Sequence, residues 1–127
     1  MRHKRQEVAA LCLWGNPSPA VRHLLRCAAH TLPHSTALLL WADIDYGGLN
    51  ILAHLRQQVS SHFAPYCMDI ATLRAHRKWA QPLSKNDERN LAQIRQQVVL
   101  SDMTQLIDYM LLEDIKLEQE AVEFGVK

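Results

Sequence analysis

Short apolar runs alternate with helix-type patterns along the first half of this chain. The runs at residues 8–14 (VAALCLW) and 37–41 (ALLLW) are continuous, and a weaker one covers residues 66–70. Continuous apolar runs of this length are typical of strands buried on both faces, as in a parallel sheet. Two helix-type apolar faces separate the runs: Val21, Leu24, Leu25 and Ala28, then Ile51, Leu52, Leu55 and Val59. This order predicts right-handed crossovers and a parallel α/β sheet.

Several capping signals predict where helices begin. Ser18 followed by Pro19 gives the first helix an N-cap and a proline at its first position. Residues 84–87 (SKND) resemble a capping box, which predicts a helix running to about Val98. Ser101 is expected to cap the next helix, whose apolar face is Met103, Leu106, Ile107, Met110 and Leu111.

The second half of the chain is predicted to be helical. Residues 73–79 are expected to form a short helix or turn, which residues 81–83 (QPL) break, and residues 116–124 a last polar helix. We therefore expect one domain over residues 1–127. Residues 1–6 would be a basic tail and residues 80–127 a helical C-terminal part packed on the same sheet.

Composition sets limits on the class of protein. The chain has 127 residues and a formal net charge of +1, so overall charge gives no argument for nucleic acid. No apolar run reaches the roughly 18 residues that a membrane span needs, so we expect no membrane contact. The cysteines Cys12, Cys27 and Cys67 are far apart, which favours reduced thiols and a cytoplasmic location. The seven histidines show no zinc-binding spacing.

An acidic pair follows the second predicted strand. Asp43 and Asp45 have i, i+2 spacing, and Gly47 and Gly48 come next, before a helix. Ligands bind beyond the carboxyl ends of parallel strands, and this spacing aims both carboxylates in one direction if the strand is still extended there. The glycines would form a turn that lets backbone approach a ligand. The pair predicts a Mg²⁺ or Mn²⁺ site. The alternative is that Asp45 caps the helix and Asp43 is a solvated strand end.

Other charged residues are candidates with equally simple alternatives. Asp69 would end the third strand at the same edge, as a third ligand or as a helix cap. Arg74, Arg77 and Lys78 could contact DNA phosphates, with a solvated basic turn as the alternative. Glu118 and Glu120, placed on a helix, would point to opposite sides, which favours a structural role.

Four segments carry a family resemblance, in one order along nearly the whole chain. They are residues 15–20 (GNPSPA), 41–48 (WADIDYGG), 68–73 (MDIATL) and 116–121 (KLEQEA). The second resembles the DxDxxG motif of Toprim domains. All four together resemble the C-terminal domain of the Wadjet subunit JetD.

The resemblance implies a Toprim-like fold over residues 1–127. It also implies a metal-dependent DNA endonuclease domain from a plasmid-defence complex built around an SMC-like ATPase. Asp43 and Asp45 match the metal-binding aspartates of the Toprim motif and would be the catalytic pair. The glutamate that such domains carry on an earlier strand has no match here, because Glu7 lies at the start of a strand. We therefore expect this chain alone to lack efficient nuclease activity.

Two further readings stay open. The first is a non-catalytic interaction or DNA-binding module that keeps the fold. The second, weaker one is a receiver-like or phosphatase-like domain. A missing neighbouring strand would also leave a sheet edge or an apolar face uncovered, for self-association or another segment to cover.

Overall fold

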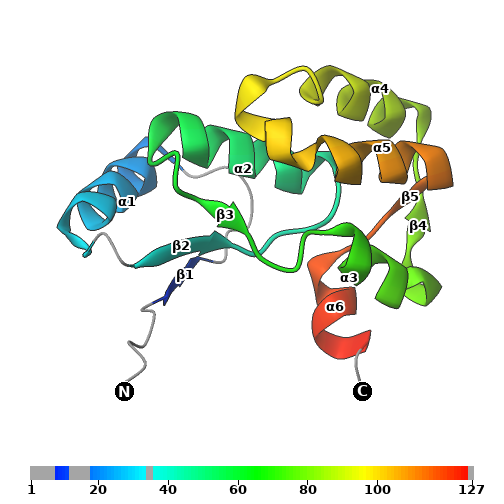
Figure 1. The fold of residues 1–127 in the computed structure, drawn as a ribbon, viewed down its shortest axis with the longest axis horizontal. Coiled ribbons are helices and arrows are strands. Elements are labelled where there is room, and N and C mark those ends of the chain that lie inside the picture. Colours follow the sequence, from blue (N-terminus) through cyan, green and yellow to red (C-terminus); the bar gives the residue numbers. More distant parts are fainter. Residues whose placement is uncertain (1–7, 12–17, 34–35, 126–127) are drawn as a thin grey trace, which may run out of the picture.

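A computed structural model describes the backbone of residues 8–11, 18–33 and 36–125, and the side chains within 18–33 and 36–122. The fold is α/β, as predicted, and Figure 1 shows its arrangement. The predicted basic tail and Glu7 lie outside the described residues. In chain order the elements are β1 (Val8–Leu11), α1 (Pro19–Thr31), β2 (Ala37–Leu40), α2 (Tyr46–Gln58), β3 (Ala64–Pro65), α3 (Ile70–Ala75), η1 (Arg77–Trp79), β4 (Gln81–Pro82), α4 (Lys85–Ile94), η2 (Val98–Met103), α5 (Thr104–Glu113), β5 (Ile115–Lys116) and α6 (Gln119–Gly125).

The main sheet is parallel, with strand order β1-β2-β3. Its register pairs Val8 with Ala37 and Leu39 with Ala64. Helices α1 and α2, which connect the strands, lie on the same side of this sheet (Figure 1). Among the described strands, β1 and β3 are therefore the two edges.

The predicted position of the third strand, residues 66–70, is wrong. The strand comprises only Ala64–Pro65, and a loop follows it. Cys67 adopts a left-handed backbone conformation with φ 54°, which stops an extended strand. The apolar signal came instead from Met68, which is 2% exposed and fills the core from this loop.

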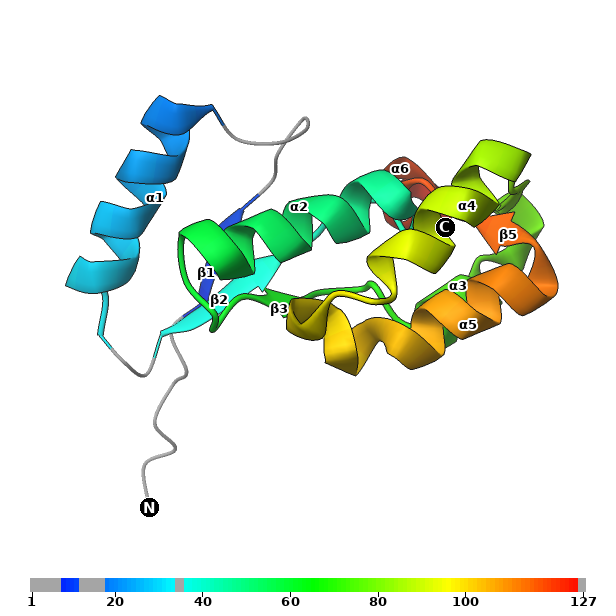
Figure 2. The same cartoon turned by 90° about the horizontal axis from the view of Figure 1, so that it is seen from above.

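Helix α1 begins where the sequence predicts, but its apolar face is not buried. The Ser18 hydroxyl accepts a hydrogen bond from the Val21 N–H at 3.3 Å, and Pro19 is the first helical residue. Leu24 is nevertheless 67% exposed and Val21 37% exposed, while Leu25 packs partly against the core. Figure 2 shows α1 set to one side of α2 and the other helices.

The second half contains a small antiparallel sheet that the sequence analysis missed. Strand β4 pairs with β5, with Gln81 opposite Lys116 and Pro82 opposite Ile115. The last helix therefore begins at Gln119, and the prediction of helix from residue 116 is wrong. Asp114, in the left-handed region with φ 58°, ends α5 and turns the chain into β5.

The helices of this half differ from the prediction at some ends. The capping box is confirmed, because Ser84 and Asp87 exchange hydrogen bonds of 2.9 and 3.0 Å. However, α4 ends at Ile94, and the separate helix η2 covers Val98–Met103. Ser101 lies inside η2, so it does not cap α5 with its side chain.

The core forms where α2 packs against α4 and η2, and α5 packs in turn against α4 and η2. Leu49, Leu52 and Leu55 of α2 have no exposed surface. Arg56 fastens α2 to η2, because it donates to the Val99 carbonyl at 2.7 Å and to both carboxylate oxygens of Asp102 at 2.6 and 2.9 Å. Among the described helices, none has both the length and the apolar character needed to cross a bilayer.

Candidate metal site

The chain stays extended for several residues after β2 ends. Ile44 exchanges two backbone hydrogen bonds with Leu117, of 2.8 and 3.0 Å, and so forms an antiparallel bridge. The backbone at Asp45 is still extended, with φ −154° and ψ −179°. The extended geometry that the i, i+2 spacing requires is therefore present from β2 to the start of α2.

Side chains alternate along this extended segment. Ala42 and Ile44 are buried, at 5% and 1% exposed, whereas Asp43 and Asp45 are only half-buried. Successive side chains of an extended chain point to opposite faces, so the two carboxylates share the face away from Ile44. This places the acidic pair side by side at the carboxyl edge of the parallel sheet.

Asp43 is more than a solvated strand end. Its Oδ1 accepts a hydrogen bond of 2.6 Å from the backbone N–H of Gln119, the first residue of α6. Asp43 therefore ties the end of the main sheet to α6 through this oxygen.

Asp45 caps α2, which was the alternative role predicted for this residue. Its Oδ1 accepts a hydrogen bond of 2.8 Å from the Gly48 N–H. Burial raises the pKa of Asp45, and the negative charge of Asp43 raises it further, while the Gly48 bond and the positive charge of Lys116 lower it. A cation placed between the two carboxylates would offset the cost of burying the Asp45 charge and the repulsion between Asp43 and Asp45.

The two glycines of the motif play different roles. A Cβ on Gly48 would lie 1.9 Å from the carbonyl oxygen of Asp43, so the backbone of α2 passes too close for any side chain there. A Cβ on Gly47 would meet only Asp45 Oδ1, at 3.4 Å. Gly48 is therefore the position where a glycine is required for the turn.

Asp69 is occupied as a helix cap. Its Oδ1 accepts a hydrogen bond of 2.7 Å from the Thr72 N–H at the start of α3, and the residue is exposed. Within the described part of the chain, no three His, Cys, Asp or Glu side chains gather closely enough to hold a metal ion. Asp43 and Asp45 are therefore the two aspartates that the structure brings together, and the ligand role of Asp69 stays a prediction.

The three predicted DNA-binding residues are exposed and have partners within the chain. Arg77 pairs with Glu113 at 2.9 Å, and the Arg74 guanidinium lies 5.2 Å from the centre of the Tyr109 ring. Both contacts join α3 and η1 to α5. Lys78 lies over the ring of Trp79, 5.6 Å from its centre. These contacts fit the basic-turn reading, and DNA contact by the three residues stays a prediction.

A family model described as "Wadjet protein JetD, C-terminal" matches residues 2–127. The chain belongs to this family. One curated relative, "Wadjet protein JetD" of Bacillus cereus (strain Q1), is 28% identical over 120 residues, which are 94% of this chain. The matched part is 29% of that relative, so the chain spans less than a third of its length.

The structure brings two further charged residues to the acidic pair of this JetD-type domain. Leu117 is 1% exposed, like its bridge partner Ile44, so its neighbours Lys116 and Glu118 lie on the same face as Asp43 and Asp45. The prediction of a helix over residues 116–124 did not place Lys116 and Glu118 on this face. The alternation in residues 115–118 (IKLE) was the signal for an extended segment.

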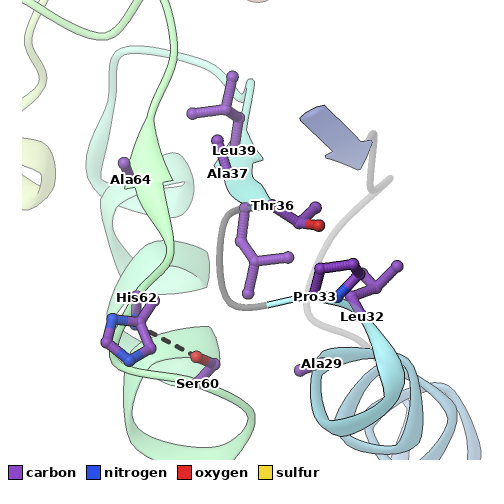
Figure 3. A pocket seen from close by; sticks show the side chains of 10 residues that line it. Ala29, Leu32, Pro33, Thr36, Ala37, Leu39, Ser60, His62 and Ala64 are labelled. Carbon is purple, nitrogen blue, oxygen red and sulfur yellow. Dashed lines mark hydrogen bonds between the residues drawn. The ribbon is translucent and has the colours of Figure 1, made fainter. Parts of the chain in front are cut away.

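A cavity of about 340 Å³ lies at the other end of β2. Its lining comes from the end of α1, the start of β2 and the loop before β3 (Figure 3). Among the described residues of that lining, His62 is the one titratable residue, and its backbone N–H donates to Ser60 Oγ at 3.2 Å. No carboxylate is found among the described residues that line this cavity, so those residues offer a hard cation no anionic ligand.

Proposed function

We propose that this JetD-type domain has a Toprim-like fold, binds Mg²⁺ or Mn²⁺ through Asp43 and Asp45, and forms part of a metal-dependent DNA endonuclease. The proposal rests on the placement of the two aspartates. Both lie on one face of an extended segment at the carboxyl edge of a parallel sheet, and the Ile44–Leu117 bridge fixes this segment. The family model and the JetD relative support it.

The donor set suits a hard cation. Each carboxylate uses one oxygen for a backbone N–H, Gln119 for Asp43 and Gly48 for Asp45, which fixes its orientation. Mg²⁺ is usually held by one or two carboxylates and completes its octahedron with water and substrate phosphate. A bound cation would polarise a phosphodiester oxygen and stabilise the charge that develops on it during phosphoryl transfer.

We expect the 127-residue chain alone to be a weak nuclease or none. Asp43 and Asp45 supply two carboxylates, and among the described residues no group of three His, Cys, Asp or Glu side chains gathers closely enough to hold an ion. The relative that matches this domain is a much longer protein, so residues outside the matched region would complete the site. Robust Mg²⁺-dependent nicking of plasmid by the purified chain would contradict this expectation.

Metal-dependent DNA binding tests the proposal directly. Fluorescence anisotropy of a labelled duplex would be measured with the purified chain in Mn²⁺ and in EDTA. We expect Mn²⁺ to tighten binding for the wild type but not for the double variant Asp43→Asn/Asp45→Asn. Glu88→Gln, which removes an exposed carboxylate of α4, is the control and should behave like the wild type. A metal effect that survives the double variant would reject the site.

One observation favours the second candidate, an interaction module. The apolar face of α1 remains open, with Leu24 67% exposed. Sedimentation velocity of the wild type and of Leu24→Glu tests whether this face joins two copies of the chain. We expect the wild type to self-associate as its concentration rises and Leu24→Glu to stay monomeric. Identical profiles would remove self-association through α1.

A further inference from the structure

Lys116 is fixed beside the acidic pair by the backbone on both of its sides. In β5 it pairs with Gln81 of β4, and the next residue, Leu117, is bridged to Ile44. In an antiparallel pair, the residue before Leu117 lies beside the residue after Ile44. The register therefore places Lys116 next to Asp45. Figure 1 shows β5 leading from the end of α5 towards α6.

The ammonium group of Lys116 is held by a second anchored residue. Its Nζ lies 2.8 Å from Oδ2 of Asp87, the same oxygen that accepts the Ser84 N–H in the capping box of α4. The Lys116 side chain is 29% exposed, so the group is reachable from solvent although it is oriented. An ammonium has three N–H donors, and Asp87 takes one of them.

Lys116 is also electrically coupled to the candidate ligands. The pKa of Lys116 is raised mainly by the hydrogen bond to Asp87, and also by the charges of Asp45 and Glu118. The Lys116 charge in turn acts on Asp45. Without a positive charge nearby, the negative charges of these carboxylates would repel a phosphate.

We propose that Lys116 is a substrate-binding residue of this site, whose ammonium donates a hydrogen bond to a phosphate oxygen of the DNA strand held at Asp43 and Asp45. This inference rests on the proposed function and adds a residue to it. The competing reading is an ion pair with Asp87 that only fastens β5 to α4. The two readings differ in what happens when Lys116 and Asp87 are removed separately.

The test compares four variants of the chain by duplex anisotropy in Mn²⁺ over a range of salt concentrations. Lys116→Met keeps the aliphatic stem and removes the charge, and Lys116→Arg keeps the charge. Asp87→Asn breaks the ion pair but leaves the lysine. Lys85→Met, at an exposed position on the first turn of α4, is the control for losing one positive charge.

We expect Lys116→Met to weaken DNA binding about tenfold and to reduce the slope of log K against log salt by about 1, since one phosphate contact is lost. Lys116→Arg should stay within about threefold of the wild type, and Asp87→Asn and Lys85→Met should retain its affinity. Mn²⁺ affinity should not fall in Lys116→Met, because a positive charge next to Asp45 has been removed.

Three results would overturn the inference. In the first, Lys116→Met binds DNA with the affinity and salt slope of the wild type. In the second, Asp87→Asn loses as much affinity as Lys116→Met, which indicates a structural ion pair. In the third, the wild type shows no Mn²⁺-dependent DNA binding, and then the proposed function fails together with this inference. The first two results leave the proposed function standing.

Discussion

The Asp43 carboxylate accepts a hydrogen bond from the Gln119 backbone N–H at 2.6 Å, which ties the end of the main sheet to the first residue of α6. The Ile44–Leu117 bridge lies directly beside this contact. The candidate site is therefore built by two segments that are far apart in sequence but held together by the backbone. This arrangement gives Asp43 a structural role that variants can separate from metal binding.

Asn and Ala at position 43 should have different effects on stability. Asp43→Ala leaves the Gln119 N–H without its acceptor, which should lower the free energy of unfolding by about 1 kcal/mol. Asp43→Asn retains an acceptor oxygen and should stay within about 0.5 kcal/mol of the wild type. Urea unfolding in EDTA measures both. Equal losses in the two variants would mean that the charge, and not the hydrogen bond, stabilises this contact.

The two glycines provide a matched pair for the turn. Gly48→Ala forces a Cβ to within 1.9 Å of the Asp43 carbonyl oxygen, so it should lower the free energy of unfolding by about 3 kcal/mol and displace Asp43. Gly47→Ala adds a contact at 3.4 Å on an exposed helical position. It should be neutral or stabilising by up to about 1 kcal/mol. Thermal and urea unfolding compare the two, and similar losses would contradict the described turn.

Asp45 should make stability depend on pH in a defined direction. Its folded pKa is raised above 3.8, mainly by burial, so the folded state holds this proton more tightly than the unfolded state. The resulting stabilisation is complete below pH 3.8 and is lost as pH rises through the folded pKa. Asp45→Asn keeps a capping oxygen and carries no charge. In EDTA it should be more stable than the wild type at pH 7, and the difference should vanish below about pH 3.8. A difference that grows in acid would reverse the assigned shift.

Asp69 offers a test of the third predicted ligand. Because it caps α3 through the Thr72 N–H, Asp69→Ala should cost about 1 kcal/mol, and Asp69→Asn should restore most of it. If the carboxylate is only a cap, Asp69→Asn should bind Mn²⁺ like the wild type. A tenfold loss of Mn²⁺ affinity in Asp69→Asn would instead make it a ligand.

The sequence predicted those features of the fold that depend on local patterns. The two continuous apolar runs located β1 and β2, and Ser18 and Ser84 marked helix starts that the structure confirms. The i, i+2 spacing of Asp43 and Asp45 required an extended backbone, and the backbone is extended there. These signals lie within a few neighbouring residues, so they can be read without knowing what packs against them.

The features that the sequence analysis missed depend on distant partners. Strand β5 has two residues and is fixed by β4 and Ile44, so the surrounding helical pattern hid it together with Lys116. The apolar face of α1 predicted the helix correctly, but a periodic pattern cannot show whether a partner surface exists. Leu24 therefore stays exposed although its position in the pattern is that of a core residue.

The most direct measurement is a Mn²⁺ titration of the purified chain followed by electron paramagnetic resonance, which reports free Mn²⁺. The wild type, Asp43→Asn, Asp45→Asn and the control Glu88→Gln would be compared at pH 7. We expect one bound ion in the wild type and the control, and at least about a tenfold loss of affinity in each aspartate variant. If all four proteins titrate alike, Asp43 and Asp45 do not hold a metal ion and the proposed site is rejected.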